Sequence, residues 1–415
     1  MNQLKILHVT QGYWPAIGGT EWLMQRLSEE LVRQFNDEVT VFTTNCYSGE
    51  SFWSPNMPRM KTGQDEINGV KIHRFPVYSH LSRALGPIQK FAFSLGLPFN
   101  DYLRTYYSGP IIPGLVSRIQ AFPADIIAAS SFPLLHMYNA QKAGQKSKRP
   151  VVFFGGLHPV EKWGFGRPNI YKAIKKASYY IAYTGFEAQY VINKGAQPEK
   201  VAVIGLGVDP QPFQNISVED AKRRYGLEGK KVVGFIGQIG GHKGVDTLIK
   251  AMPQVWEQCA DTYVLIAGSR TLFCDNLEKM ISEWPEEFQK KIILHYNFGI
   301  EEKPWLFSAV DIFVYPSGFE SFGISFLEAW AASKPVIGCR VGAIPWVVQA
   351  GLDGFLIEYQ NPAMLSEAIS ILLKNPTLAH EMGEVGQRKV ISQYTWPKVA
   401  ANFRKIYLSA INASK

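Results

Sequence analysis

Residues 312–328 read Ile-Phe-Val-Tyr-Pro-Ser-Gly-Phe-Glu-Ser-Phe-Gly-Ile-Ser-Phe-Leu-Glu. The apolar run at 312–315 is typical of a short strand that is buried in a parallel sheet. A loop with Glu320 follows it, and the pattern over 322–332 predicts a helix. A strand, a loop and a helix in this order indicate an α/β fold, in which ligands bind beyond the carboxyl ends of the strands.

The same alternation of strands and helices extends from this segment through the chain in two series. In the first half, residues 6–10, 20–35 and 39–42 predict a strand, an amphipathic helix and a strand. Four more strands are predicted there, at 125–128, 151–154, 179–182 and 201–204. In the second half, strands are predicted at 231–236, 263–267, 292–295, 312–315, 336–339 and 354–357, and further helices at 219–225 and 244–256.

A turn-rich joint, Gly-Leu-Gly-Val-Asp-Pro at 205–210, separates the two series. A chain of 415 residues is long for a single core and sufficient for two. We therefore predict two Rossmann-like, doubly wound domains that face a cleft, with the boundary after residue 208.

Residues 47–114 interrupt the alternation, because they are rich in Pro, Gly, Ser and aromatic residues. We predict loops and one or two irregular helices here, and we take the region as the candidate acceptor region. Within residues 81–99, Arg83 and Lys90 lie among clustered phenylalanines. This composition suits the surface of a bilayer, although a packed hydrophobic helix fits it equally well.

Positive charge is concentrated in the first half of the chain. Residues 1–208 contain 22 Lys and Arg against 13 Asp and Glu, which gives +9, whereas the remainder contains 21 against 22, which gives −1. A solvated surface explains the excess as well as an anionic partner does, such as a phospholipid surface, a lipid phosphate or an acidic acceptor. Nucleic acid is not expected, because no nucleic-acid-binding motif accompanies the charge.

Targeting and membrane signals are not found in this sequence. No apolar run approaches the roughly 18–20 residues of a membrane-spanning helix, and the N-terminus lacks the layout of a secretory signal. The cysteines have no metal-ligand or redox spacing, which fits free thiols in a reducing compartment. We expect a cytoplasmic protein with four free thiols, at Cys46, Cys259, Cys274 and Cys339.

The two glutamates of the opening segment carry the strongest chemical signal. Glu320 precedes a predicted helix whose first N–H groups, at Phe322, Gly323 and Ile324, are suited to stabilise an anion. Glu328 lies roughly 12 Å farther along, at 1.5 Å per residue. The two carboxylates could contact opposite ends of one extended ligand, such as a sugar hydroxyl and a ribose. The alternative is that Glu320 caps the helix and Glu328 is a surface residue.

Glycine-containing loops follow other predicted strands. Residues 237–244 read Gly-Gln-Ile-Gly-Gly-His-Lys-Gly and place Lys243 where it would suit a diphosphate, although the spacing is not that of a P-loop. Gly18 and Gly19 precede the first predicted helix and allow a ligand to approach the backbone. His158 follows a predicted strand at the carboxyl edge of its sheet. The alternatives are a tight turn at 237–244, a simple strand-to-helix turn at Gly18 and Gly19, and a structural role for His158.

Motifs of several other enzyme classes are absent from the sequence. It contains no Asp-x-Asp pair, no His-Glu-x-x-His and no Gly-x-Ser-x-Gly. We therefore expect no metal ion and no cofactor, and serine hydrolysis loses support.

Together these residues resemble the family 4 retaining glycosyltransferases, which have the GT-B fold. The similarity covers nearly the whole chain and includes the Pro-x-x-Gly-Gly loop that ends at Gly19 and the Gly-Val-Asp joint at 207–209. The Lys-Gly turn at Lys243 also belongs to it, and its most specific part is the pair of glutamates separated by seven residues, Glu320 and Glu328.

The end of the chain also resembles this family. Residues 394–407 are similar to the family's terminal helix, which implies a helix over 396–415 that crosses back to the first domain. The resemblance thus implies an acceptor-binding domain at 1–208 and a nucleotide-sugar-binding domain at 209–395.

The resemblance implies a role for each candidate residue. Glu320 would contact hydroxyls of the donor sugar, Glu328 the ribose and Lys243 the diphosphate. The glycine loop (Gly18 and Gly19) and the amides of Phe322, Gly323 and Ile324 would line the phosphates, while His158 would touch the sugar near the reacting carbon. The implied reaction is a front-face transfer that retains the anomeric configuration, in which the leaving phosphate helps to deprotonate the acceptor.

Two positions depart from the family pattern. Gln238 stands where the family usually has arginine, and Arg270 is a candidate to replace the missing phosphate contact. Trp346 stands where the family often has glutamate.

We therefore predict a metal-independent, retaining glycosyltransferase of the hexosyltransferase type. It would move a sugar from a nucleoside-diphosphate sugar to a hydroxyl of a glycan, lipid-linked or small-molecule acceptor, and an anionic membrane surface is a candidate partner. The alternatives are a nucleotide-sugar epimerase or hydrolase on the same scaffold, or a binding protein with impaired catalysis.

Overall fold

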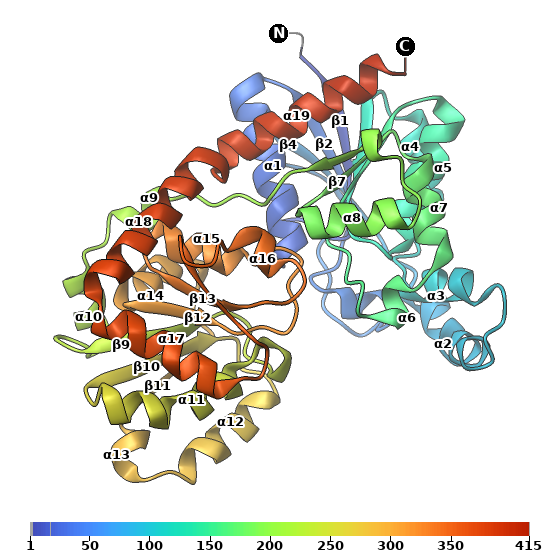
Figure 1. Cartoon of the computed structure of the whole chain (residues 1–415). Coiled ribbons are helices and arrows are strands. Elements are labelled where there is room, and N and C mark those ends of the chain that lie inside the picture. Colours follow the sequence, from blue (N-terminus) through green and yellow to red (C-terminus); the bar gives the residue numbers. More distant parts are fainter. Residues whose placement is uncertain (1–2, 17, 415) are drawn as a thin grey trace. The chain divides into compact units, whose positions relative to one another are not determined.

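The structure, a computed structural model, describes residues 3–16 and 18–414 and divides into two compact units. The first unit contains the residues up to Leu206 together with those from Trp396 onward, and the second contains Gly207–Thr395. Each unit has a sheet dominated by parallel strands with helices packed on it (Figure 1). The predicted α/β class with two doubly wound sheets is confirmed.

The first unit is built on an eight-stranded sheet in the order β3-β4-β2-β1-β5-β6-β7-β8. All neighbours pair in parallel except β3 and β4, which are antiparallel. The central strands are buried on both faces, as their apolar runs predict. The strands are β1 (Lys5–Val9), β2 (Glu38–Thr44), β3 (Gly63–Ile67), β4 (Val70–Phe75), β5 (Ile126–Ala129), β6 (Val151–Phe154), β7 (Tyr179–Ala182) and β8 (Val201–Val203).

Helices connect these strands and cover the sheet. The α-helices of the first unit are α1 (Gly19–Phe35), α2 (Ser79–Ser94), α3 (Asn100–Ser108), α4 (Leu115–Ala121), α5 (Leu135–Ser147), α6 (Lys162–Phe165), α7 (Pro168–Lys176), α8 (Gly185–Asn193) and α19 (Trp396–Asn412). Two short 3-10 helices are η1 (Gly49–Phe52) and η2 (Pro198–Lys200).

The prediction of only loops and irregular helices over residues 47–114 was wrong at β3 and β4. These two strands form a hairpin around Asn68 and Gly69, whose φ angles are 50° and 79°. Two positive φ angles are the requirement of a type I′ turn, for which Asn-Gly is the preferred pair. The Asn-Gly pair was therefore a signal of the hairpin in the sequence, and the aromatic and proline content around it hid this signal.

The terminal helix α19 is held in the first unit by a buried ion pair. The guanidinium of Arg404 donates from Nε to Asp37 Oδ2 at 2.8 Å and from Nη2 to Oδ1 at 2.9 Å. Asp37 also accepts the N–H of Leu4 at 2.9 Å, so that the start of the sheet, the turn before β2 and α19 share one carboxylate. A paired guanidinium and carboxylate tolerate burial because each satisfies the charge of the other.

His8 provides a second link between β1, α1 and α19. Its Nδ1 lies 2.7 Å from Ser28 Oγ, and its Nε2 lies 3.1 Å from the hydroxyl of Tyr407. Ser28 Oγ donates to the carbonyl of Met24, so it accepts from a proton on Nδ1, and Tyr407 donates to Nε2. The neutral imidazole satisfies all three groups, and burial lowers the pKa of His8 to about 3.

The second unit is built on six parallel strands in the order β11-β10-β9-β12-β13-β14. The chain moves outward from β9 through β10 to β11 and then returns to the other side of β9 at β12. The strand order therefore reverses between β9 and β12, where open α/β sheets bind ligands. The strands are β9 (Lys231–Ile236), β10 (Thr262–Gly268), β11 (Ile292–Tyr296), β12 (Ile312–Tyr315), β13 (Val336–Cys339) and β14 (Gly354–Ile357).

The helices of the second unit alternate with these strands. They are α9 (Gln211–Gln214), α10 (Val218–Arg224), α11 (Val245–Gln258), α12 (Phe273–Ser282), α13 (Glu286–Gln289), α14 (Lys303–Ala309), α15 (Ile324–Ala331), α16 (Ile344–Val347), α17 (Pro362–Lys374) and α18 (Pro376–Gln393), with the 3-10 helices η3 (Gly241–Lys243) and η4 (Ile300–Glu302). None of the described helices combines the length and apolar character that crossing a membrane requires.

The buried imidazole predicts a dependence of stability on pH. The pKa of His8 is about 3 in the folded chain and 6.5 as its ordinary value, so the unfolded chain binds the proton more readily. The contribution of the neutral His8 to the free energy of unfolding is complete above pH 6.5. It is lost as the pH falls toward 3, by about 1.4 kcal/mol per pH unit. Urea unfolding at several pH values gives the slope of the free energy of unfolding against pH. This slope should be smaller in His8→Asn and unchanged in the exposed-site control His80→Asn. Equal slopes in all three proteins would contradict the assignment.

Candidate functional site

Two loops meet at the switch point of the second sheet. One follows β9 and contains η3, and the other joins β12 to α15. The N–H of Gly318 donates to the carbonyl of His242 at 2.8 Å, so a main-chain hydrogen bond ties one loop to the other. The two sequence segments with the strongest chemical signals are thus brought together by the fold.

Gly244 allows the close contact between these loops. Its φ angle is 73°, and an added Cβ would lie 2.1 Å from the carbonyl oxygen of Pro316. Any side chain at this position would force the two loops apart. The glycine after Lys243 is therefore required by the contact and not only by the turn.

Lys243 and Glu320 form an ion pair at this junction. Nζ of Lys243 donates to Oε1 of Glu320 at 2.6 Å, and each side chain keeps 13–14% of its surface exposed. Nζ also lies 5.6 Å from the centre of the buried Tyr315 ring, which ends β12. The pair thus places a cation and a hydrogen-bond acceptor at the carboxyl end of the sheet, within reach of a bound molecule.

Glu328 has a lysine partner of its own. Nζ of Lys303, the first residue of α14, donates to Glu328 Oε1 at 2.6 Å. Among the described residues no group hydrogen-bonds to the other oxygen, Oε2, which is buried. A buried acceptor without a partner costs about 1–3 kcal/mol, so this atom is an available position for a hydroxyl donor.

Both carboxylates lie near the ring of Tyr315. Burial raises the pKa of Tyr315, and the negative charges of Glu320 and Glu328 raise it further. Glu320 lies in the loop before α15 and Glu328 lies near the middle of this helix, so both charges act on the side chain that ends β12. Each glutamate is paired with a different lysine.

The helix that follows Glu320 begins slightly later than predicted. α15 starts at Ile324, with Gly323 as its N-cap at a φ angle of 90°, and the side chain of Phe322 is buried against Tyr394. In the described structure the N–H groups of Phe322, Gly323 and Ile324 donate to no protein acceptor. The start of a helix leaves its first N–H groups unpaired and carries a partial positive charge, which favours an anion there.

Gln238, which departs from the family pattern, and Arg270, its candidate replacement, follow the neighbouring strands β9 and β10. Gln238 follows β9 and is exposed. Arg270 is ion-paired with two side chains of α12, Asp275 at 2.7 Å and Glu278, and its hydrogen bond to Glu278 raises its pKa. A phosphate contact by Arg270 would require it to exchange these partners, so this role stays a prediction.

In the first unit, Gly18 is the N-cap of α1, in the loop that follows β1. β1 and β5 are the neighbours at which the strand order of the first sheet reverses. An added Cβ at Gly18 would lie 2.2 Å from Oε2 of Glu21, whereas no atom of the described residues lies within 4 Å of one at Gly19. The backbone at Gly19 is therefore not covered by these neighbours, and a ligand contact there stays a prediction.

His158 lies in the loop after β6, and the buried carboxylate of Glu187 fixes this loop. Glu187 Oε1 accepts the N–H groups of Gly156 and Leu157, both at 2.8 Å. The same carboxylate accepts the hydroxyl of Tyr180 and the N–H of Tyr183, also at 2.8 Å each. Burial raises the pKa of Glu187.

The imidazole of His158 is partly buried, with its ring centre 5.4 Å from that of Phe165 in α6. The loop therefore holds His158 at the carboxyl edge of the first sheet.

Sequence reasoning did not identify Lys303 or Glu187. Lys303 pairs with Glu328 over 25 residues and stands in an ordinary Glu-Glu-Lys-Pro helix start, so no local pattern marks it. Glu187 occupies the first turn of α8, where an acidic residue is common and suggests capping. Its burial and its reach across to the loop after β6 become visible only in three dimensions.

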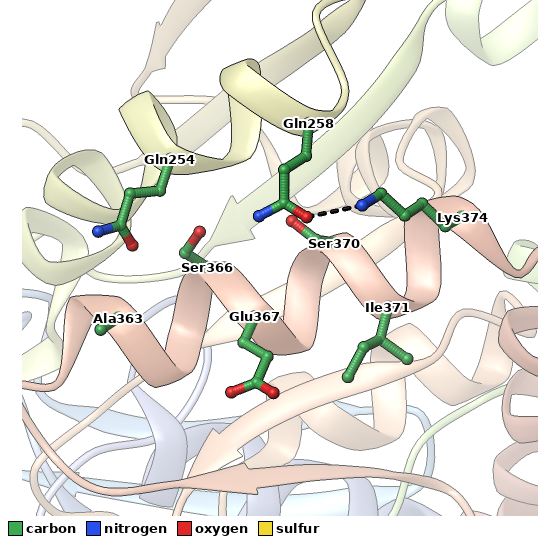
Figure 2. Close-up of a pocket in the computed structure, with 8 residues that line it drawn as sticks. All are labelled: Gln254, Gln258, Ala363, Ser366, Glu367, Ser370, Ile371 and Lys374. Atoms are coloured by element: carbon green, nitrogen blue, oxygen red, sulfur yellow. Dashed lines mark hydrogen bonds between the residues drawn. The ribbon is translucent and has the colours of Figure 1, made fainter.

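A separate groove lies between α11 and α17 (Figure 2). Gln254 and Gln258 line it from α11, and Ser366 and Ser370 face them from α17. Lys374 closes one end with a hydrogen bond to Gln258 of 2.6 Å. None of the predicted site residues belongs to this groove.

Sequence comparisons match both halves of the chain to glycosyltransferases. Residues 217–389 match the model of glycosyl transferases group 1, and residues 17–212 match that of glycosyltransferase family 4. An uncharacterized glycosyltransferase of Methanocaldococcus jannaschii, MJ1607, is 25% identical over 98% of this chain and 99% of its own length. Spore coat protein SA of Bacillus subtilis is 29% identical over 67% of this chain and 78% of its own length.

Solved structures share the whole fold. HepE from Anabaena, determined in complex with UDP-glucose, superposes with a TM-score of 0.72 at 16% identity, over 98% of this chain and all of its own. Sucrose-phosphate synthase from Thermosynechococcus elongatus superposes with a TM-score of 0.72 at 18% identity, over 99% of this chain and all of its own. With both halves of the sequence matched and the fold shared throughout, the chain belongs to glycosyltransferase family 4 and has the GT-B fold.

Proposed function

We propose that this glycosyltransferase moves a hexosyl group from a nucleoside-diphosphate sugar to an acceptor hydroxyl, with retention at the anomeric carbon and without a metal ion. The observation that carries the proposal is the arrangement at the switch point of the second sheet. Two lysine–glutamate pairs flank the unpaired N–H groups at the start of α15, and one carboxylate oxygen of Glu328 is free to accept a hydroxyl.

The donor would lie along α15 from Glu320 to Glu328. Its pyrophosphate would accept from Lys243 and from the N–H groups at the start of the helix, where the partial charge favours an anion. Glu320 would accept a hydroxyl of the transferred sugar, and Oε2 of Glu328 would accept a hydroxyl of the ribose. In the first unit, the glycine loop at Gly19 is proposed to contact phosphate oxygens, and the imidazole of His158 is proposed to contact the sugar.

The transfer step follows from the groups available. The bond between the anomeric carbon and the leaving phosphate oxygen breaks, and the acceptor oxygen bonds to the same face of that carbon. The acceptor proton passes to the leaving phosphate, which serves as the base. The protein stabilises the departing negative charge through Lys243 and helix N–H groups, which is the role that a metal ion has in other transferases.

Known structures support a nucleotide sugar as the donor. HepE from Anabaena has been determined with UDP-glucose, and the catalytic domain of starch synthase IV from Arabidopsis thaliana with ADP and acarbose. The acceptor is proposed to be a glycan, a lipid-linked glycan or a small molecule. The excess positive charge of the first half favours an acceptor or surface that carries negative charge.

An alternative function has one specific observation in its favour. Gln238 replaces the arginine typical of the family, and Arg270 is ion-paired with α12. A chain with weakened phosphate contacts would bind the donor without transferring the sugar. An epimerase or hydrolase would instead convert the donor when no acceptor is present, so incubation of the donor alone separates these cases from transfer.

Substitutions at the first lysine–glutamate pair should separate binding from turnover. Lys243→Ala should raise the Kd for UDP or ADP about tenfold or more, because a charge-assisted hydrogen bond contributes about 1.5–3 kcal/mol. Glu320→Gln should lower kcat on the order of a hundredfold through misplacement of the sugar, while the Kd for the nucleotide changes little. Isothermal titration and steady-state assays measure both, and Lys250→Ala on the exposed side of α11 is the matched control. Full activity in both variants would disprove the donor-site assignment.

The stereochemistry and the metal requirement can be tested in one assay. A thermal-shift panel of nucleotide sugars first selects the donor, because a specific ligand stabilises the folded state. NMR of the early product should then show the same anomeric configuration as the donor, and the initial rate should persist in excess chelator. An inverted product would disprove the front-face mechanism, and a rate that chelator abolishes and magnesium restores would disprove metal independence.

A further inference from the structure

Helix α2 presents its apolar side outward. Leu81, Ala84, Ile88, Phe91 and Leu95 recur at intervals of three and four residues, and all are exposed, with Ile88 at 54% and Phe91 at 63%. The side that packs on the protein carries small and polar residues, namely Ser79, Ser82, Gln89 and Ala92. A helix of a globular protein normally has the reverse arrangement, so this stripe has no partner within its own unit.

Helix α3 extends this apolar surface. Phe99 precedes the helix, and Tyr102 and Tyr106 follow at intervals of three and four residues, each about half exposed. We call the combined surface the α2–α3 face; it consists of Leu81, Ile88, Phe91, Leu95, Phe99 and Tyr102. Tyrosine combines an apolar ring with a polar hydroxyl, which suits the boundary between a bilayer and water.

The helices α2 and α3 form a helical hairpin whose exposed charges have one sign. Arg83 and Lys90 are exposed on α2, and the only carboxylate between residues 79 and 108 is that of Asp101, which is buried. No exposed negative charge of this hairpin therefore opposes an anionic surface. Apolar side chains with basic residues at their margin are the composition of helices that lie on anionic membranes.

The hairpin is held firmly on its inner side. The Arg104 guanidinium lies 4.6 Å from the centre of the Phe93 ring, and the Tyr107 ring stacks on Trp53 with the ring centres 6.0 Å apart. Asn169 of α7 donates to Thr105 Oγ1 at 2.9 Å. These contacts fix α2 and α3 against the unit, so the outer face is exposed in the folded unit and not through local unfolding.

The hairpin lies at the carboxyl edge of the first sheet. The chain enters α2 directly after β4, and the carbonyl of Gly109, after α3, accepts the N–H of Leu135 at the start of α5. Figure 1 shows α2 and α3 at the same end of this unit as α6, which follows the loop with His158. A surface bound by the hairpin would therefore lie on the ligand-binding edge of the first unit.

We propose that the α2–α3 face docks this protein on an anionic lipid bilayer. The apolar side chains enter the interface, while Arg83 and Lys90 contact lipid phosphates. A second copy of the chain fits less well, because a symmetric contact would bring the same basic residues of both copies together. The proposal stands on the hairpin alone and does not depend on the proposed transfer reaction.

Vesicle sedimentation of the full chain tests the docking surface. The probes are vesicles of phosphatidylcholine with phosphatidylglycerol and vesicles of phosphatidylcholine alone, at low salt. The wild type should sediment with the anionic vesicles only. Ile88→Ser/Phe91→Ser and Arg83→Glu/Lys90→Glu should each lower the partition coefficient roughly tenfold or more, because one removes apolar insertion and the other the attraction.

Matched controls come from exposed positions in the second unit, Leu272→Ser and Lys290→Glu, which should bind as the wild type does. The thermal midpoint of every variant verifies folding. Equal sedimentation with both vesicle types, no sedimentation at all, or wild-type binding by the hairpin variants would overturn the proposal. Sedimentation velocity tests whether a second copy of the chain occupies this face instead. A wild-type dimer that Ile88→Ser/Phe91→Ser dissociates, in a protein that does not bind vesicles, would assign the face to self-association.

Discussion

The hydrogen bond from the N–H of Gly318 to the carbonyl of His242 joins the two loops that supply Lys243 and Glu320. These residues are separated by 77 positions in the sequence, and only the return of the chain from β11 to β12 makes their loops neighbours. Gly244 permits the contact, since any side chain there would meet the backbone at Pro316. The candidate donor site therefore depends on sheet topology first and on side-chain chemistry second.

Charge at this site is balanced before any ligand binds. Each glutamate has a lysine partner, so the cations are positioned without an excess of charge, and the start of α15 contributes only a partial positive charge. A pyrophosphate would compete with the carboxylate of Glu320 for Lys243. This competition is a reason for donor binding and release to depend on the negative charge of the nucleotide's phosphates.

Much of the fold could be predicted from the sequence, because short apolar runs and glycine-rich loops mark parallel strands and their carboxyl ends. β6, β7, β9, β12, β13 and β14 have the predicted bounds. The prediction failed at β3 and β4, where the Asn-Gly turn was overlooked. Of the site, the candidate glutamates and Lys243 carry local signals, whereas Lys303 and Glu187 act through partners far along the chain.

The sequence also could not predict which side of α2 packs on the protein and which side faces outward. An apolar stripe with helical spacing normally indicates the buried side, and both a packed helix and a surface helix were consistent with residues 81–99. Only the packing of Ser82, Gln89 and Ala92 against the unit shows that the apolar side faces out.

Hydrogen–deuterium exchange of the full chain tests the central claim most directly, with and without the nucleoside diphosphate that gives the largest thermal shift. Binding of the pyrophosphate at the switch point of the second sheet should slow exchange in peptides that cover residues 237–244 and 317–326. Protection confined to other segments, with both of these loops unchanged, would contradict the account.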